Sequence, residues 1–143
     1  MMGPAFPRLT PANHRVTSPA TTDYNCIAWA AGDTAHWWEP GRFWPLSVGR
    51  DEFGVGALET AFRHLGFEPC ESEAPEPGFE KVALYAESAL HYTHAARQLA
   101  TGLWTSKLGG AEDIEHDSPD DVAGGVYGEV VQFMKRPIRS PAT

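Results

Sequence analysis

The spacing of apolar residues changes once along the chain, near Gly78. Before it, apolar residues recur at three- and four-residue intervals and end in a glycine, which predicts a helix over residues 54–66. After it, short apolar runs predict strands over residues 81–86, 90–100, 103–108 and 128–134. Because helices come first and strands later, we predict an α+β fold: N-terminal helices packed on a C-terminal antiparallel sheet.

A second, shorter helix is predicted where the sequence reads TDYNCIAWAAGD. Thr22 or Asp23 is its expected N-cap, and Gly32 is its expected C-cap. Small or apolar residues lie on nearly every face of this helix, so we expect it to be buried. Another short helix is expected over residues 118–122.

The length of 143 residues predicts one domain. Residues 1–22 contain four prolines and are expected to form an extended surface arm. The domain itself is expected over residues 23–136, followed by a C-terminal tail over residues 137–143.

The charge balance and the apolar pattern exclude several classes of protein. There are 19 Asp and Glu against 11 Lys and Arg, a net charge of −8, and no basic cluster, so no nucleic-acid partner is expected. No apolar segment is long enough for a membrane span, and no secretory signal is visible, so we expect a cytoplasmic protein, with export by a dedicated secretion system as the alternative. Two cysteines are too few for a disulfide framework, and both thiols are expected to be free.

Cys26 is the first candidate for chemistry. It lies in the first turn of the predicted short helix, where unpaired amides and the positive end of the helix dipole favour a thiolate. The backbone N–H of Cys26 is a natural donor to an oxyanion, with Tyr24 or Asn25 as a second donor. The alternative is that Cys26 is a small buried core residue, which is the commoner role of a free cysteine.

His94 is the second candidate, because it lies in the middle of a predicted strand. A histidine beside a cysteine can take the thiol proton and later deliver it to a leaving group. The alternative is a buried histidine that is satisfied by a neighbouring strand. His91 is expected on the opposite side of the same strand, and no zinc-binding motif is present, so no metal site and no cofactor are expected.

Trp37, Trp38 and Trp44 form an aromatic, proline-containing loop soon after Cys26. They either cover the short helix or form one wall of a substrate cleft.

The order of a cysteine on an early helix and a histidine on a later strand resembles the papain-like cysteine hydrolases. The segment YNCIAWA resembles the nucleophile helix of the NlpC/P60 and CHAP branch, and PGFEKVALYA resembles the strand that precedes the histidine strand. THAARQLATGLWTSKLGG resembles the histidine hairpin of the same branch. The chain departs from that branch because neither Ser nor Gly follows Cys26. The YNCIAWA and WTSKLG blocks also resemble those of an uncharacterised bacterial group, which carries no function over to this chain.

The resemblance implies a third residue that orients His94, and its position aligns with Ser106. Whether Ser106 lies on the face of His94 depends on the length of the hairpin loop, because a shift of one residue turns every side chain to the other face. Asp113 is the alternative third residue.

The sequence therefore predicts a thiol hydrolase or acyltransferase that acts on a peptide, a protein or another amide. Cys26 is its expected nucleophile, and His94 is its base and later its acid. The alternative is a catalytically inactive domain that serves as a protein-binding module. The oligomeric state stays open.

Overall fold

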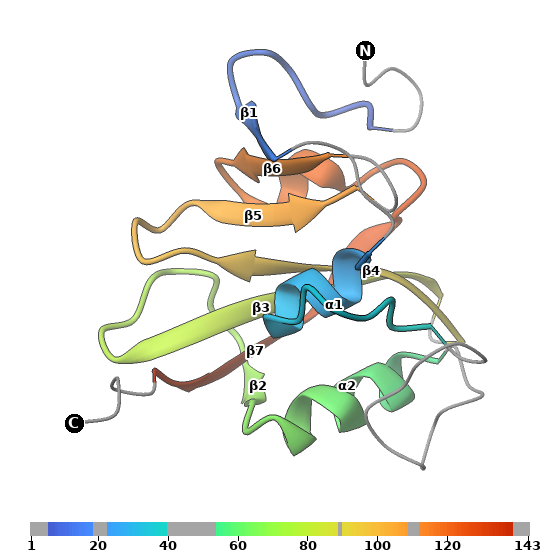
Figure 1. Ribbon diagram of the computed structural model, residues 1–143, viewed down its shortest axis with the longest axis vertical. Helices are drawn as coiled ribbons and strands as arrows, with labels where there is room; N and C mark the ends of the chain where they lie inside the picture. Colours follow the sequence, from blue (N-terminus) through green and yellow to red (C-terminus); the bar gives the residue numbers. More distant parts are fainter. Residues whose placement is uncertain (1–5, 19–22, 40–53, 89, 109–111, 139–143) are drawn as a thin grey trace.

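The computed structural model describes residues 6–18, 23–39, 54–88, 90–108 and 112–138. Its centre is a seven-stranded antiparallel sheet with the strand order β1-β6-β5-β4-β3-β7-β2 (Figure 1). The strands are β1 (His14–Ser18), β2 (Glu68–Cys70), β3 (Phe79–Ser88), β4 (His91–Gln98), β5 (Trp104–Lys107), β6 (Asp113–His116) and β7 (Glu129–Pro137).

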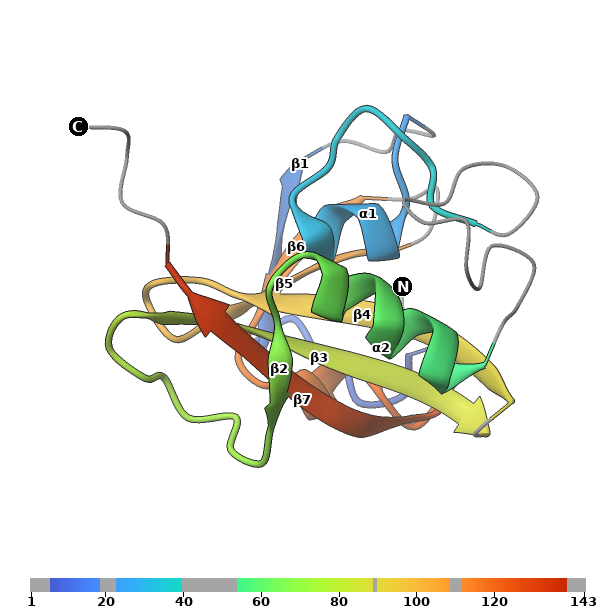
Figure 2. The ribbon, with the colours of Figure 1, turned by 90° about the horizontal axis from the view of Figure 1, so that it is seen from below.

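Two α-helices, α1 (Cys26–Ala31) and α2 (Val55–His64), lie on one face of this sheet (Figure 2). A 3-10 helix, η2 (Pro119–Val122), contributes to the core on the other face. None of the helices in the described part of the chain is long and apolar enough to cross a membrane.

The predicted fold class was wrong, because the sheet dominates the structure and the helices do not form a layer of comparable size. The two α-helices have only 6 and 10 residues, against seven strands. Three of these strands were not predicted. Strand β1 lies within the expected surface arm, β2 follows α2 directly, and β6 lies in a run of acidic residues.

The missed strands share a lack of apolar alternation. Strand β1 reads HRVTS and is largely exposed, and β6 reads DIEH and carries mostly polar side chains. Each is held by backbone pairing with a neighbour: β1 pairs with β6, and β6 pairs with β5. Pairing of this kind depends on residues that are far apart in the sequence, so the periodicity of a single segment does not reveal it.

The cap of α1 differs from the prediction in its position. Asn25, and neither Thr22 nor Asp23, is the N-cap. The Asn25 side-chain oxygen accepts hydrogen bonds from the backbone N–H of Ala28 and of Trp38, both at 3.1 Å, and its amide donates to the Trp38 carbonyl at 2.7 Å. One buried side chain therefore begins the helix at Cys26 and also holds the following loop against it. Gly32, with φ +86°, ends the helix as predicted.

Two hydrophobic clusters fill the two faces of the sheet. The first joins α1 and α2 to Val82, Leu84 and Met134, and it includes Cys26. The second joins Ala83, Tyr85, Trp104, Ile114 and Tyr127, among others, to residues near η2 and the N-terminal segment. Alternate residues of β3 belong to opposite clusters, as the pleat of a strand requires.

Replacement of Asn25 with Ala is expected to lower the free energy of unfolding by about 2 kcal/mol. The variant loses the helix cap and leaves buried backbone N–H groups without an acceptor. Urea denaturation measures the change. The matched control is Thr60→Ala, because Thr60 donates only an exposed bond to the Gly56 carbonyl within α2. Equal stability of the two variants would contradict this role of Asn25.

Candidate functional site

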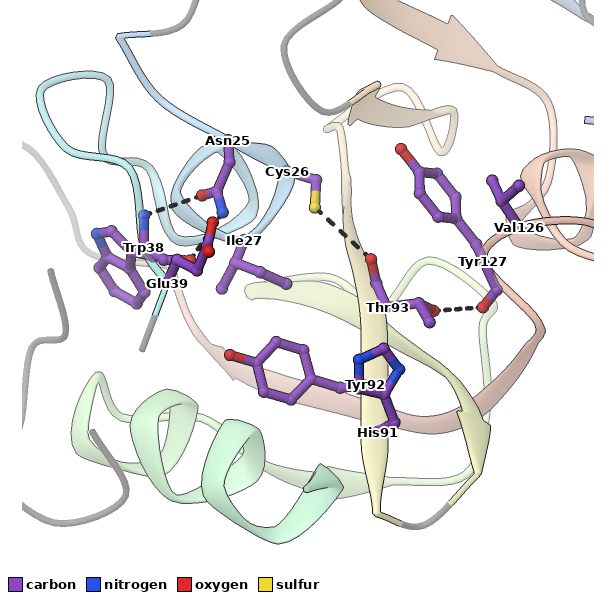
Figure 3. Close-up of a pocket in the computed structure, with 10 residues that line it drawn as sticks. All are labelled: Asn25, Cys26, Ile27, Trp38, Glu39, His91, Tyr92, Thr93, Val126 and Tyr127. Carbon is purple, nitrogen blue, oxygen red and sulfur yellow. Dashed lines mark hydrogen bonds between the residues drawn. The ribbon is translucent and has the colours of Figure 1, made fainter. Parts of the chain in front are cut away.

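Cys26 is the first residue of α1, and its side chain is 7% exposed. The sulfur points toward β4 and lies 4.0 Å from the carbonyl oxygen of Thr93 (Figure 3). It borders a pocket of about 260 Å³ between α1, β4 and the segment before β7. The pocket is lined by Asn25, Cys26, Ile27, Trp38, Glu39, His91, Tyr92, Thr93, Val126 and Tyr127.

The Cys26 thiol is protonated at neutral pH. Burial raises its pKa to about 11, against the opposing effect of the backbone N–H groups of Ala95, Ile27 and Cys26 itself and of the Lys107 ammonium group. The helix N-terminus does favour a thiolate, as the sequence suggested, but the loss of hydration is the larger effect.

His94 is held in a row of three polar side chains that are all fully buried. Its Nε2 lies 2.9 Å from the Ser106 hydroxyl, which lies 2.7 Å from Nε2 of His116. Nδ1 of His116 lies 2.8 Å from the backbone carbonyl oxygen of Ser118. We call His94, Ser106 and His116 the polar row.

The polar row lies where β4 and β5 diverge. Their backbone pairing comprises Arg97 with Thr105 and Gln98 with Trp104, and it does not extend to His94. The side-chain bond between His94 and Ser106 links the strands beyond that point. This placement puts Ser106 on the same face as His94.

Aromatic rings fix the orientation of the His94 imidazole. The ring of Tyr127 stacks on it with centroids 4.0 Å apart and an angle of 9° between the planes. The ring of Tyr85 meets it edge-on at 5.0 Å. Burial and the nearby His116 hold the pKa of His94 well below its usual range, so the imidazole is neutral. Its Nδ1 is buried and has no hydrogen-bond partner among the described residues.

Cys26 and His94 approach the same point of β4 from opposite faces of the sheet. The sulfur contacts the backbone at Thr93 and Ala95, the two residues that flank His94. Thr93 lies at an irregularity of the sheet, because the register passes from His94 to Tyr92 without it. No hydrogen bond joins the sulfur to the imidazole in the described structure.

Asp113, the alternative third residue, does not contact His94. It accepts a hydrogen bond of 2.8 Å from the Tyr24 hydroxyl, and the Lys107 ammonium group lies 5.3 Å from the centre of the Tyr24 ring. Burial and, as the smaller effect, the hydrogen bond to Asp113 raise the pKa of Tyr24 to about 12. Tyr24 is therefore a hydrogen-bond donor to a carboxylate, and its hydroxyl is not directed at an oxyanion.

The other candidates near α1 stabilise the local structure. The Asn25 side chain caps α1 and holds Trp38. The Trp38 ring nitrogen donates to Asp33 at 2.8 Å, and the Trp37 ring nitrogen donates to Glu39 at 2.7 Å. Trp38 lines the pocket and also packs in the buried cluster over α1, so both interpretations of this loop stay open, whereas Trp44 lies outside the described residues.

Two residues of the site were not singled out from the sequence. His116 completes the polar row, and the Lys107 ammonium group is one of the groups that oppose the raised pKa of Cys26. The signal for His116 was its spacing from Ile114, which places both on one face of a strand. That signal is readable only once residues 113–116 are known to form β6.

Within the described ranges, no group of three or more His, Cys, Asp and Glu side chains could hold a metal ion. Both cysteines are free thiols, with Cys26 buried and Cys70 half-buried.

The fold and the site together define a sheet-dominated antiparallel domain with a buried cysteine at a helix start and a buried histidine row behind it. The chain belongs to a family described as a domain of unknown function (DUF7689), whose match covers residues 15–135. No curated protein and no solved structure matches the chain.

Alkylation of Cys26 by iodoacetamide, in a Cys70→Ser background, is expected to be slow at pH 7 and to rise steadily up to pH 10. A pKa of about 11 leaves roughly one thiol in ten thousand ionised at pH 7. Mass spectrometry of the modified protein measures the rate. A plateau that begins below pH 8 would show a stabilised thiolate and would contradict this protonation state.

Proposed function

We propose that the protein is a thiol-dependent hydrolase or acyltransferase that acts on an amide bond through Cys26 and His94. One observation carries this proposal. The polar row binds Nε2 of His94 and leaves Nδ1 buried and without a partner, while the Cys26 sulfur contacts the residues on either side of His94. An imidazole nitrogen that is shielded from water and has a free lone pair is suited to act as a general base.

The reaction begins with a neutral thiol and a neutral imidazole. The Cys26 proton moves to Nδ1 of His94 as the sulfur attacks the carbonyl carbon of the substrate. The backbone N–H groups of Ala95, Ile27 and Cys26, which contact the sulfur, supply the donors to the oxyanion in this proposal. The carbon–nitrogen bond then breaks, and His94 returns the proton to the leaving amine.

The thioester that remains on Cys26 is resolved by water or by another acceptor. His94 takes a proton from the attacking molecule, and the sulfur leaves with a proton from His94. Hydrolysis and transfer use the same residues, because they differ only in the acceptor.

Proton transfer requires the Cys26 sulfur and Nδ1 of His94, which approach β4 from opposite faces, to come within hydrogen-bond reach when a substrate fills the pocket. The irregularity of β4 at Thr93 is where the strand would have to shift to allow this. Catalytic hydrogen bonds are often long or absent without substrate and tighten in the bound complex. The sulfur already borders the pocket, so a substrate carbonyl bound there would lie beside it.

Two observations favour the second candidate, a protein-binding module without catalysis. The Cys26 thiol is protonated, and the sulfur contacts the Thr93 carbonyl and not the His94 imidazole. The pocket with Trp38 and Tyr92 would then be part of a binding surface.

The test is acylation by p-nitrophenyl acetate, a small activated ester. We expect Cys26 to gain one acetyl group, detected by mass spectrometry of the intact protein and of its peptides, as p-nitrophenolate is released. Replacement of His94 with Ala is expected to slow acetylation about 10²- to 10⁴-fold, as loss of a general base does. Cys26→Ala should abolish it.

The matched control is Cys70→Ser, because Cys70 is the other free thiol and borders a different pocket. This variant should be acetylated at the wild-type rate. Acetylation of Cys70 in preference to Cys26, or a rate that does not change in His94→Ala, would overturn the enzymatic proposal in favour of a binding module.

A further inference from the structure

The end of the polar row at the Ser118 carbonyl fixes where every proton in the row lies. A carbonyl oxygen can only accept, so Nδ1 of His116 must carry a proton and donate it. If His116 is neutral, its Nε2 then carries no proton and must accept from the Ser106 hydroxyl.

The same reasoning extends to His94. A serine hydroxyl has a single proton, and Ser106 gives it to His116. The Ser106 oxygen must therefore accept its second bond, and Nε2 of His94 is the donor. A neutral imidazole has one N–H, so Nδ1 of His94 is left with a free lone pair.

We propose that His116 is a positioning residue that selects the tautomer of His94. The Ser118 carbonyl sets the direction of the hydrogen bonds in the row, because it can only accept. The catalytic consequence rests on the proposed function, because the selected nitrogen is the one that receives the Cys26 proton. The tautomer itself does not depend on whether the protein is an enzyme.

Protonation of His116 reverses the direction of the hydrogen bonds in the polar row. A cationic His116 donates from both nitrogens, so the Ser106 hydroxyl turns and donates to Nε2 of His94. His94 then carries its proton on Nδ1 and cannot act as a base toward Cys26.

The surroundings of His116 decide when this reversal occurs. Burial and the nearby His14 of β1 disfavour the cation, and the Ser118 carbonyl, Asp121 of η2 and Asp117 favour it. His94 of β4 lies across Ser106 and is neutral. Burial is the largest of these effects, so the pKa of His116 lies below its usual value, and the proposed direction of the row holds at neutral pH.

The experiment is a long-range proton–nitrogen correlation spectrum of the full chain labelled with ¹⁵N-histidine, recorded at pH 7.5 and then at falling pH. At pH 7.5 we expect His94 to be protonated only at Nε2 and His116 only at Nδ1. As His116 titrates, the proton of His94 should move to Nδ1. Protonation of His94 at Nδ1 at pH 7.5 would overturn the proposal.

Two variants test the direction of influence. In His116→Phe the Ser106 hydroxyl loses its acceptor and can donate to His94, so Nδ1-protonated His94 should become populated. Ser106→Ala breaks the bridge with a smaller change of volume, and it should also release the tautomer preference if His116→Phe does not fold. His64→Gln is the matched control, because His64 is exposed at the end of α2 and outside the row.

An unchanged His94 tautomer in Ser106→Ala would also overturn the proposal. The acetylation assay separates this result from a failure of the proposed function. If the tautomers follow the prediction but Cys26 is never acetylated, the row is a structural device in a protein without this activity. If Cys26 is acetylated but the tautomers differ from the prediction, the proposed activity is supported and the proposed role of His116 is wrong.

Discussion

The structure depends on one chain of hydrogen bonds that runs through the hydrophobic cluster on one face of the sheet. Three fully buried polar side chains, His94, Ser106 and His116, satisfy one another in sequence and end on the Ser118 carbonyl. An unpaired buried polar group costs about 1–3 kcal/mol, so a row of this kind persists only if its members are satisfied together. The exception is Nδ1 of His94, which is buried and has no hydrogen-bond partner among the described residues.

The row also explains the topology around it. It takes one residue from each of three adjacent strands, β4, β5 and β6, so it requires the three strands to be neighbours in that order. The short pairing between β4 and β5 leaves the space in which His94 and Ser106 meet. On the opposite face, Asn25 fixes the start of α1 and thereby places the Cys26 sulfur against β4.

The sequence predicted the elements with clear periodicity and missed those without it. Helix α2 and strands β3, β4, β5 and β7 follow apolar patterns, whereas β1 and β6 are polar and are held by pairing with distant segments. Missing them made the helices seem the larger part of the fold. Of the candidate third residues, only Ser106 contacts His94, because the hairpin places it on that face. The sequence could not decide this, since one residue of register separates the alternatives.

The sequence also could not predict that the Cys26 thiol is protonated. A cysteine at a helix start suggests a thiolate, but burial opposes ionisation and is the larger effect here. The reaction proposed above therefore begins with proton transfer during attack and not with a preformed ion pair.

The most direct test of this central claim is the solvent deuterium isotope effect on acetylation of Cys26 by p-nitrophenyl acetate. We expect slower acetylation in D₂O than in H₂O, because in the proposed reaction a proton moves from sulfur to Nδ1 of His94 in the rate-limiting step. This difference should disappear in His94→Ala. Equal rates in the two solvents, or a faster rate in D₂O, would show attack by a preformed thiolate and would contradict the account.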